Sequence, residues 1–152
     1  MEDTVRDEQR KAQLEIQRAT ATALESGEHF IKSLGMNDVE IDGVELAVEL
    51  PVTPRLTNGR GTLQGGLIAT LVDMVAGRLA MAGAPTGYNT ATNDLTIHFL
   101  SPVVEGPARA EGTVLRRGRR TVVVHVDVRD VATDRLAAVS TISFTVLTPL
   151  AR

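Results

Sequence analysis

A single acidic side chain, Asp73, lies within an otherwise apolar stretch that follows a loop rich in glycine. The stretch runs from Asn58 to Gly83 and reads NGRGTLQGGLIATLVDMVAGRLAMAG. Its apolar residues surround nearly the whole helix that we expect over 67–82, and such a helix is enclosed by its fold. Because a carboxylate in that setting is desolvated, it becomes a stronger base, so we predict that Asp73 activates water or attacks an electrophile. The structural alternative is a salt bridge to Arg78, although five residues is a poor spacing for one helix face.

Two glycines, Gly65 and Gly66, lie where the loop enters this helix. The first N–H groups of a helix are unpaired and carry a partial positive charge, and glycine lets a substrate approach the backbone closely. We therefore predict that the Gly65 N–H stabilises an oxyanion, the alternative being that the pair only forms a tight turn. The preceding residue, Gln64, can polarise a carbonyl through its amide but cannot transfer protons.

Four arginines surround a glycine in the run RRGRR, at the tip of an expected hairpin. Guanidinium groups match the geometry of phosphate oxygens, so the run favours binding of an anionic carrier. The alternative is a solvated hairpin tip that protects a sheet edge. The residues of this candidate anion site are Arg116, Arg117, Gly118, Arg119 and Arg120.

The hydrophobic periodicity predicts the elements that must position these residues. Helical spacing appears over 4–25, a short helix is expected over 29–34, and Gly27 and Gly35 end them. Between residues 88 and 100, strict alternation places Thr92 on the face opposite Phe99. Strands are expected within 39–50 and over 88–100, 108–115, 121–129 and 136–147.

This order predicts an α+β fold, in which an antiparallel sheet of about five to six strands wraps around one long central helix. An extra helix precedes it. We therefore divide the chain into an N-terminal helical extension, 1–35, and a main domain, 36–152.

The composition excludes several classes of function. A net charge of −3, 3% aromatic residues and the absence of tryptophan argue against a nucleic-acid partner. The sequence contains no cysteine, and its three histidines have no metal-ligand spacing, so we expect no metal. We also expect a cytoplasmic protein without a membrane segment, because no secretory signal pattern appears and no apolar run approaches about 20 residues.

An ordered set of short motifs resembles one enzyme family. The hotdog-fold acyl-CoA thioesterases of the phenylacetate-degradation (PaaI-like) type share this set, and the 4-hydroxybenzoyl-CoA thioesterases have the same layout. The resemblance covers residues 40–147, and it departs at Gln64, where the family usually has histidine. The motifs that carry it are Asn58, Gly61, Gln64-Gly65-Gly66, Asp73, Asn93-Asp94-Leu95-Thr96 and Phe99-Leu100-Ser101-Pro102-Val103.

The resemblance implies hydrolysis of an acyl- or aryl-CoA thioester at a site shared by two subunits. The family forms homodimers, often paired into homotetramers, and uses no cofactor beyond the coenzyme A of its substrate. Asp73 would be the catalytic carboxylate that activates water or attacks the thioester, and the Gly65 N–H, assisted by Gln64, would stabilise the oxyanion. The partner subunit's Asn58 would help to hold the water or the carboxylate, and Thr92 would position the water. Further substrate contacts are implied for Gly66, Met74 and Gly77.

Several alternatives remain at this point. Asn58 fits an ordinary turn before Gly59, and Thr92 fits an ordinary strand residue. The loss of the usual histidine leaves open a non-catalytic protein that binds acyl-CoA. A hotdog dehydratase or isomerase is also open, although it would need an acid–histidine pair that the sequence does not supply.

Overall fold

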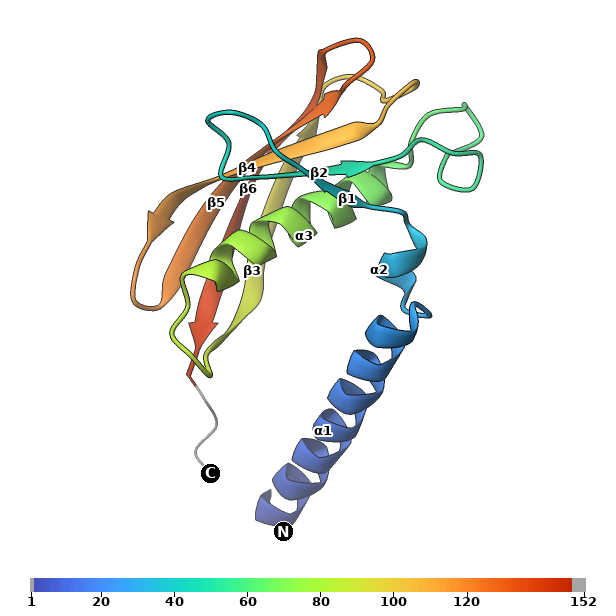
Figure 1. Ribbon diagram of the computed structural model, residues 1–152. Coiled ribbons are helices and arrows are strands. Elements are labelled where there is room, and N and C mark those ends of the chain that lie inside the picture. Colours follow the sequence, from blue (N-terminus) through green and yellow to red (C-terminus); the bar gives the residue numbers. More distant parts are fainter. Residues whose placement is uncertain (1, 149–152) are drawn as a thin grey trace. The chain divides into compact units, whose positions relative to one another are not determined.

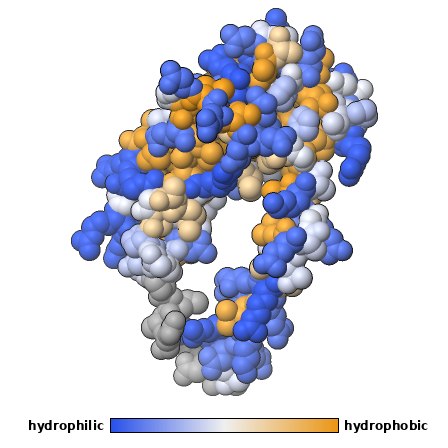
Figure 2. Space-filling model, viewed as in Figure 1, coloured by the Kyte–Doolittle hydropathy of each residue, from blue (hydrophilic) through white to orange (hydrophobic). Residues whose placement is uncertain are grey.

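The computed structural model describes residues 2–148. The chain divides into two compact units, Met1–Gly35 and Met36–Arg152. The first unit contains α1 (Glu2–Ser26) and the short α2 (Phe30–Ser33), whose first turn is capped by the imidazole of His29. The surface of α1 is mostly hydrophilic with a few apolar side chains (Figure 2).

The second unit is one antiparallel sheet that curves around α3 (Gly65–Ala82), as Figure 1 shows. The strand order is β1-β2-β4-β5-β6-β3, so β1 and β3 form the two edges. This arrangement confirms the expected α+β fold with a central helix and an additional N-terminal helix. The strands are β1 (Asn37–Val39), β2 (Leu46–Leu50), β3 (Asn89–Phe99), β4 (Ala108–Arg117), β5 (Thr121–Asp130) and β6 (Arg135–Leu147).

One face of α3 forms the core against the sheet. The helix approaches β4 closely at Gly112, where a Cβ atom would lie 2.6 Å from the side chains of both Val75 and Leu79. Length and composition alone would let α3 cross a membrane, but its buried face makes it the core helix of this unit. The buried residues of α3 are Ile68, Leu71, Val72, Val75, Ala76, Leu79 and Ala80.

The opposite side of α3 is only partly covered in a single chain. Asp73, Met74 and Gly77 are half-buried, and Gly66 and Met81 are exposed. The sheet thus covers one face of the expected central helix, and the other face stays partly open in a single chain, because a single sheet covers only one face of a helix. The half-buried side is where a substrate or a second subunit can reach Asp73.

A β-bulge at Asn93 decides which way Thr92 points. The pairing of β3 with β6 passes from Thr92–Phe144 directly to Asp94–Ser143, so Asn93 is an extra residue. An extra residue reverses the alternation of the side chains. Thr92 consequently faces α3, on the same side as Phe99, which contradicts the strict alternation expected from the sequence.

A second bulge, at Leu115 in β4, likewise reverses the side-chain alternation and so decides which way Arg117 points. The pairing with β5 passes from Val114–Val124 to Arg116–Val123, and Arg117 then pairs with Val122. Because the side chains of Val122 and Val124 are buried, Arg117 lies on the side of the sheet that faces α3. The two bulges thus direct one polar side chain each toward the helix.

Candidate active site

Asp73 and Thr92 form the polar centre of the candidate site. The Thr92 hydroxyl donates a hydrogen bond of 3.0 Å to Oδ1 of Asp73. Within residues 2–148, this hydroxyl is the sole hydrogen-bond or ion-pair partner of the half-buried Asp73 carboxylate. Since a carboxylate has about four acceptor positions, Asp73 can still accept a proton or a hydrogen bond from a bound water.

Arg78 is paired elsewhere. Its guanidinium donates two hydrogen bonds to the Asp38 carboxylate of β1, at 2.7 and 2.6 Å. These hydrogen bonds lower the pKa of Asp38; burial opposes them, and the Coulombic attraction of Arg78, the smallest of the three effects, adds to the lowering. The salt bridge between Arg78 and Asp73 that the spacing left open is therefore not formed.

The start of α3 has two free donors. Gln64 is the N-cap residue, and its carbonyl accepts hydrogen bonds from the N–H groups of Leu67 and Ile68 at 3.0 and 3.1 Å. In the described part of the chain, no acceptor pairs with the N–H of Gly65 or Gly66. The ring of Phe99 lies 3.4 Å from the position of a Cβ on Gly65, so it closes one side of this turn. The Gly65 N–H is therefore oriented and available.

The side chains of Gln64 and Asn58 differ in the hydrogen bonds that they make. The Gln64 amide is exposed, and within residues 2–148 its one hydrogen bond is a long one of 3.4 Å to the Thr57 carbonyl. Asn58 organises its own loop, because its Oδ1 accepts from Arg60 N at 2.9 Å and its Nδ2 donates to Thr62 Oγ1 at 2.9 Å. Within one chain, Asn58 thus has the turn role and does not contact Asp73.

The predicted catalytic groups form two half-sites on α3. Asp73 is eight residues beyond Gly65, which corresponds to about 12 Å along a helix axis. One water or one thioester carbonyl cannot contact both groups at that distance. Met74 and Gly77 belong to the half-site around Asp73, and a Cβ on Gly77 would lie 3.7 Å from the Phe144 ring.

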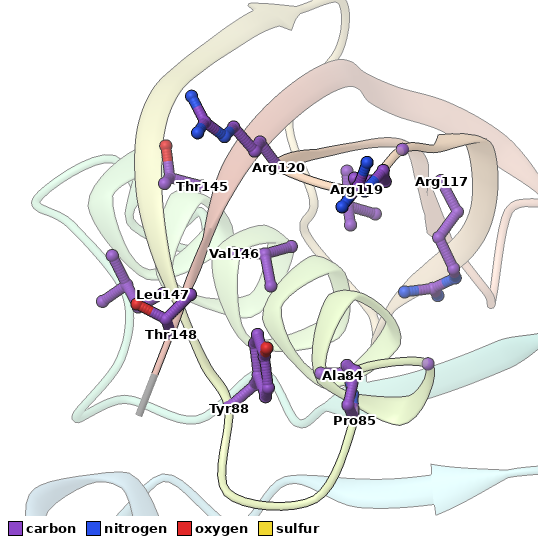
Figure 3. Close-up of a pocket in the computed structure, with 13 residues that line it drawn as sticks. Ala84, Pro85, Tyr88, Arg117, Arg119, Arg120, Thr145, Val146, Leu147 and Thr148 are labelled. Carbon is purple, nitrogen blue, oxygen red and sulfur yellow. The ribbon is translucent and has the colours of Figure 1, made fainter. Parts of the chain in front are cut away.

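A cavity of about 1110 Å³ lies at the C-terminal end of α3, beside the β4–β5 hairpin (Figure 3). Three residues of the predicted anion site, Arg117, Arg119 and Arg120, line it together with Gly118, whereas Arg116 does not. No acidic residue is among the lining residues, which otherwise are Gly83, Ala84, Pro85, Tyr88, Val122, Thr145, Val146, Leu147 and Thr148.

The arginines of this cavity differ in what they bind. Arg117 donates to the Ala80 and Leu79 carbonyls at 2.9 and 2.8 Å, so its guanidinium caps the C-terminus of α3. Gly83 leaves the space for it, since a Cβ there would overlap the guanidinium. Arg119 and Arg120 are exposed and have no ion-pair partner within residues 2–148, so their donors remain open to an anion.

Two residues near the site were missed by the sequence reasoning. The sequence places Phe99 at the end of a strand and in a motif of the family resemblance but assigns it no role in the site, whereas its ring packs on Gly65. Asp130 was not singled out, but a signal existed: it continues the buried positions of β5 after Val126 and Val128. Among residues 2–148, no group of three or more His, Asp or Glu side chains could hold a metal ion.

Comparisons with known proteins identify the family. The sequence pattern of the thioesterase superfamily matches residues 60–137. Acyl-coenzyme A thioesterase 13 of Homo sapiens is 30% identical over 123 residues, which cover 80% of this chain and 87% of the human protein. The chain therefore belongs to the thioesterase superfamily, and the motifs that suggested a thioesterase are confirmed at that level.

Solved structures agree on the architecture. The BH2602 protein of Bacillus halodurans, whose crystal structure contains CoA, is 27% identical with a TM-score of 0.71 and covers 92% of this chain and 91% of its own. A thioesterase of Haemophilus influenzae, HI1161, is 24% identical with a TM-score of 0.72, over 78% of this chain and 82% of its own. The fold is the hotdog fold.

Proposed function

We propose that this protein is an acyl-CoA thioesterase in which Asp73 activates the hydrolytic water. The observation that carries the proposal is the Asp73–Thr92 pair: a carboxylate held by one hydroxyl at 3.0 Å, with its remaining acceptor positions open on the half-buried side of α3. Membership of the thioesterase superfamily and the similarity to acyl-coenzyme A thioesterase 13 support thioester hydrolysis in general.

The reaction needs a base and an oxyanion donor. Asp73 takes a proton from water, the resulting hydroxide adds to the thioester carbon, and the carbonyl oxygen becomes an oxyanion. A Gly65 N–H donates to that oxygen, while the Gln64 amide helps to orient it. The C–S bond then breaks, the acid is released, and the CoA thiolate takes up a proton. Direct attack of Asp73, which forms a mixed anhydride that water then hydrolyses, is the other route.

The site is completed by a second subunit in this proposal. Because Gly65 and Asp73 of one helix are about 12 Å apart along the axis, we pair Asp73 of one subunit with Gly65 of the partner subunit. The open edge of β3 and the exposed Phe99 and Leu100 at its end supply an unpaired surface for such a dimer. Asn58 would reach the water from the partner only if its loop opened. Dimers would pair further into a tetramer.

The coenzyme A part of the substrate would occupy the cavity beside the β4–β5 hairpin. Gly83, in its lining, is ten residues beyond Asp73, about 15 Å along the helix axis. The phosphates would contact Arg119 and Arg120, whose donors are open, and the acyl group would lie near Met74, Gly77 and Asp73. The B. halodurans relative was solved with CoA, which supports a CoA ligand in this fold.

The subfamily and the acyl group remain predictions. The spacing of the Gln64-Gly65-Gly66 turn before Asp73 supports the PaaI-like or 4-hydroxybenzoyl-CoA type. Turnover of phenylacetyl-, benzoyl-, short-chain and medium-chain CoA esters would identify the acyl group.

Substitution of Asp73 tests the function. We expect Asp73→Asn and Asp73→Ala to lower kcat by about 10²- to 10⁴-fold, the usual contribution of a general base. Asp42→Asn, in an exposed turn, is the matched control and should hydrolyse acyl-CoA like the wild type. Full activity of Asp73→Ala would refute the role of this residue. Single turnover in H₂¹⁸O separates the two routes, because only direct attack transfers the label into Asp73.

A non-catalytic acyl-CoA-binding protein is the second candidate, favoured by one observation: Gln64 cannot transfer protons where the family usually has histidine. Binding of acyl-CoA by calorimetry, together with no turnover over the whole ester panel, would support that candidate. A dehydratase or isomerase is disfavoured, because no histidine among residues 2–148 contacts Asp73.

A matched pair of substrates tests the phosphate contacts. We expect Arg119→Ala/Arg120→Ala to raise KM for an acyl-CoA and to leave KM unchanged for the same acyl group on N-acetylcysteamine, which has no phosphates. Equal effects on both substrates would remove the phosphate assignment. Light scattering of the purified protein would test the dimer and the tetramer.

A further inference from the structure

Asp130, at the end of β5, is the one charged residue that is buried in the described part of the chain, with 2% of its surface exposed. Its carboxylate accepts three backbone hydrogen bonds from consecutive residues: Oδ2 from Val104 N at 2.9 Å and Glu105 N at 3.3 Å, and Oδ1 from Gly106 N at 2.9 Å. Hydrogen bonds to a charged acceptor are strong and directional. Asp130 therefore fixes the backbone of residues 104–106.

The residue just before this segment holds the turn at the start of α3. Val103 is fully buried, and its carbonyl accepts a hydrogen bond of 2.9 Å from the N–H of Leu63. Leu63 is itself buried and directly precedes Gln64 and Gly65. The position of the Gly65 N–H therefore depends on where the Val103 carbonyl lies.

The chain just before Val103 contacts this turn a second time. The ring of Phe99 packs on Gly65, and the Ser101 hydroxyl donates to the Leu136 carbonyl at 2.9 Å. The segment Phe99–Gly106 thus touches the turn at Leu63 and at Gly65, and it is anchored to β6 at Ser101 and to β5 at Asp130.

We propose that Asp130 is a positioning residue for thioester hydrolysis, which holds the segment Phe99–Gly106 against the turn Leu63–Gly65 and so aims the Gly65 N–H at the thioester oxygen. The inference rests on the proposed function, in which Gly65 is the oxyanion donor. Catalytic geometry is sensitive to such support, since a displacement of about 1 Å can cost about 10²-fold in rate.

Asp130→Asn tests the proposal because it keeps the volume but replaces one acceptor oxygen by an NH₂ group that faces N–H donors. The matched control is Ser140→Ala, which removes the hydrogen bond of the other buried polar residue, from Ser140 Oγ to the Thr96 carbonyl, away from the turn. Both variants are measured at a temperature at which they are fully folded. The readouts are kcat, KM and amide hydrogen exchange over residues 61–67.

For Asp130→Asn we expect kcat to fall by about ten- to a hundredfold with KM nearly unchanged, and exchange of the Leu63 N–H to become faster. Ser140→Ala should change none of the three readouts. A kcat no lower than that of the control, or unchanged exchange at Leu63, would overturn the proposal while leaving the thioesterase function intact. If the wild type hydrolyses no ester, the proposed function fails, and exchange alone decides whether Asp130 holds the turn. Should Asp130→Asn not fold, Asp130→Glu, which displaces the carboxylate by one methylene, is measured with the same expected losses.

Discussion

Asp73 and Asp130 belong to the same compact unit, but their oxygen atoms have different surroundings. Asp130 is buried and its two oxygens accept three backbone N–H groups, whereas Asp73 is half-buried and accepts one hydroxyl. A carboxylate whose acceptor positions are filled holds backbone in place. One with open positions can take a proton from water. The number of donors that the fold supplies, rather than the type of residue, separates a structural acid from a candidate catalytic one.

The same contrast separates the arginines of the β4–β5 hairpin. Arg117 uses its guanidinium on the last carbonyls of α3, while Arg119 and Arg120 have open donors beside the same cavity. Each of the two bulges directs one side chain toward α3. The bulge in β3 brings Thr92 to Asp73, and the bulge in β4 brings Arg117 to the helix end. Arg117 therefore has a different role from Arg119 and Arg120, because only the side chain of Arg117 binds the end of α3.

The largest expected effect comes from exchanging the two acids for alanine. Asp130→Ala should lower the free energy of unfolding by about 3 kcal/mol, because it leaves buried N–H donors unpaired. Asp73→Ala should leave that free energy nearly unchanged and abolish most turnover. Urea denaturation of both variants checks the expected free energies of unfolding, and kcat of both variants checks the expected turnover. If Asp73→Ala were less stable than Asp130→Ala, the distinction between Asp130 as the structural acid and Asp73 as the catalytic one would be refuted.

Removing the hydroxyl at Thr92 sharpens the assignment of Asp73. Thr92→Val keeps the shape and should lower kcat about tenfold, the value of one hydrogen bond to a charged group. Thr92→Ser should retain most activity, since it keeps the donor. The exposed Thr96, on the same strand, supplies the control variant Thr96→Val. Equal rates for both valine variants would assign Thr92 a strand role only.

The two kinds of arginine should respond in opposite ways. Arg117→Ala should lower the free energy of unfolding by about 1.5 kcal/mol, because the α3 carbonyls lose their charged donors. Arg119→Ala should leave stability unchanged and raise KM for acyl-CoA severalfold. Thermal denaturation and steady-state kinetics measure both. A stability loss for Arg119→Ala would mean that its donors are not free.

The smallest effect is expected at Asp38, which is paired but exposed. Its side chain and that of Arg78 are 60% and 44% exposed, so Asp38→Asn should cost only about 0.5 kcal/mol. Because the pKa of Asp38 in the folded protein lies below its ordinary 3.8, this contribution is present above that pH and is lost as the pH falls further. Urea denaturation at pH 7 and pH 3 should show a smaller difference between wild type and variant at pH 3 than at pH 7.

Much of the architecture was predictable because alternation and helical spacing extend over many residues. The helix 67–82 and the strands between 88 and 147 differ from the observed bounds by one or two residues. The Asp73–Thr92 pair could not be derived from that alternation, since a one-residue bulge at Asn93 reverses the face of everything before it. Asp130 could have been noticed, because an acid at the fifth buried position of an alternating strand needs donors.

The sequence by itself determined the fold class, the family and the residue types of the candidate site, because these depend on long periodic patterns and on the spacing from Gln64 to Asp73. Only the tertiary structure decided which polar groups are already paired. Arg78 binds Asp38, Arg117 binds the end of α3, and Asp73 keeps open acceptor positions. The reason is geometric: partners 19 to 40 residues apart in the chain meet through sheet register and bulges, which leave no local pattern in the sequence.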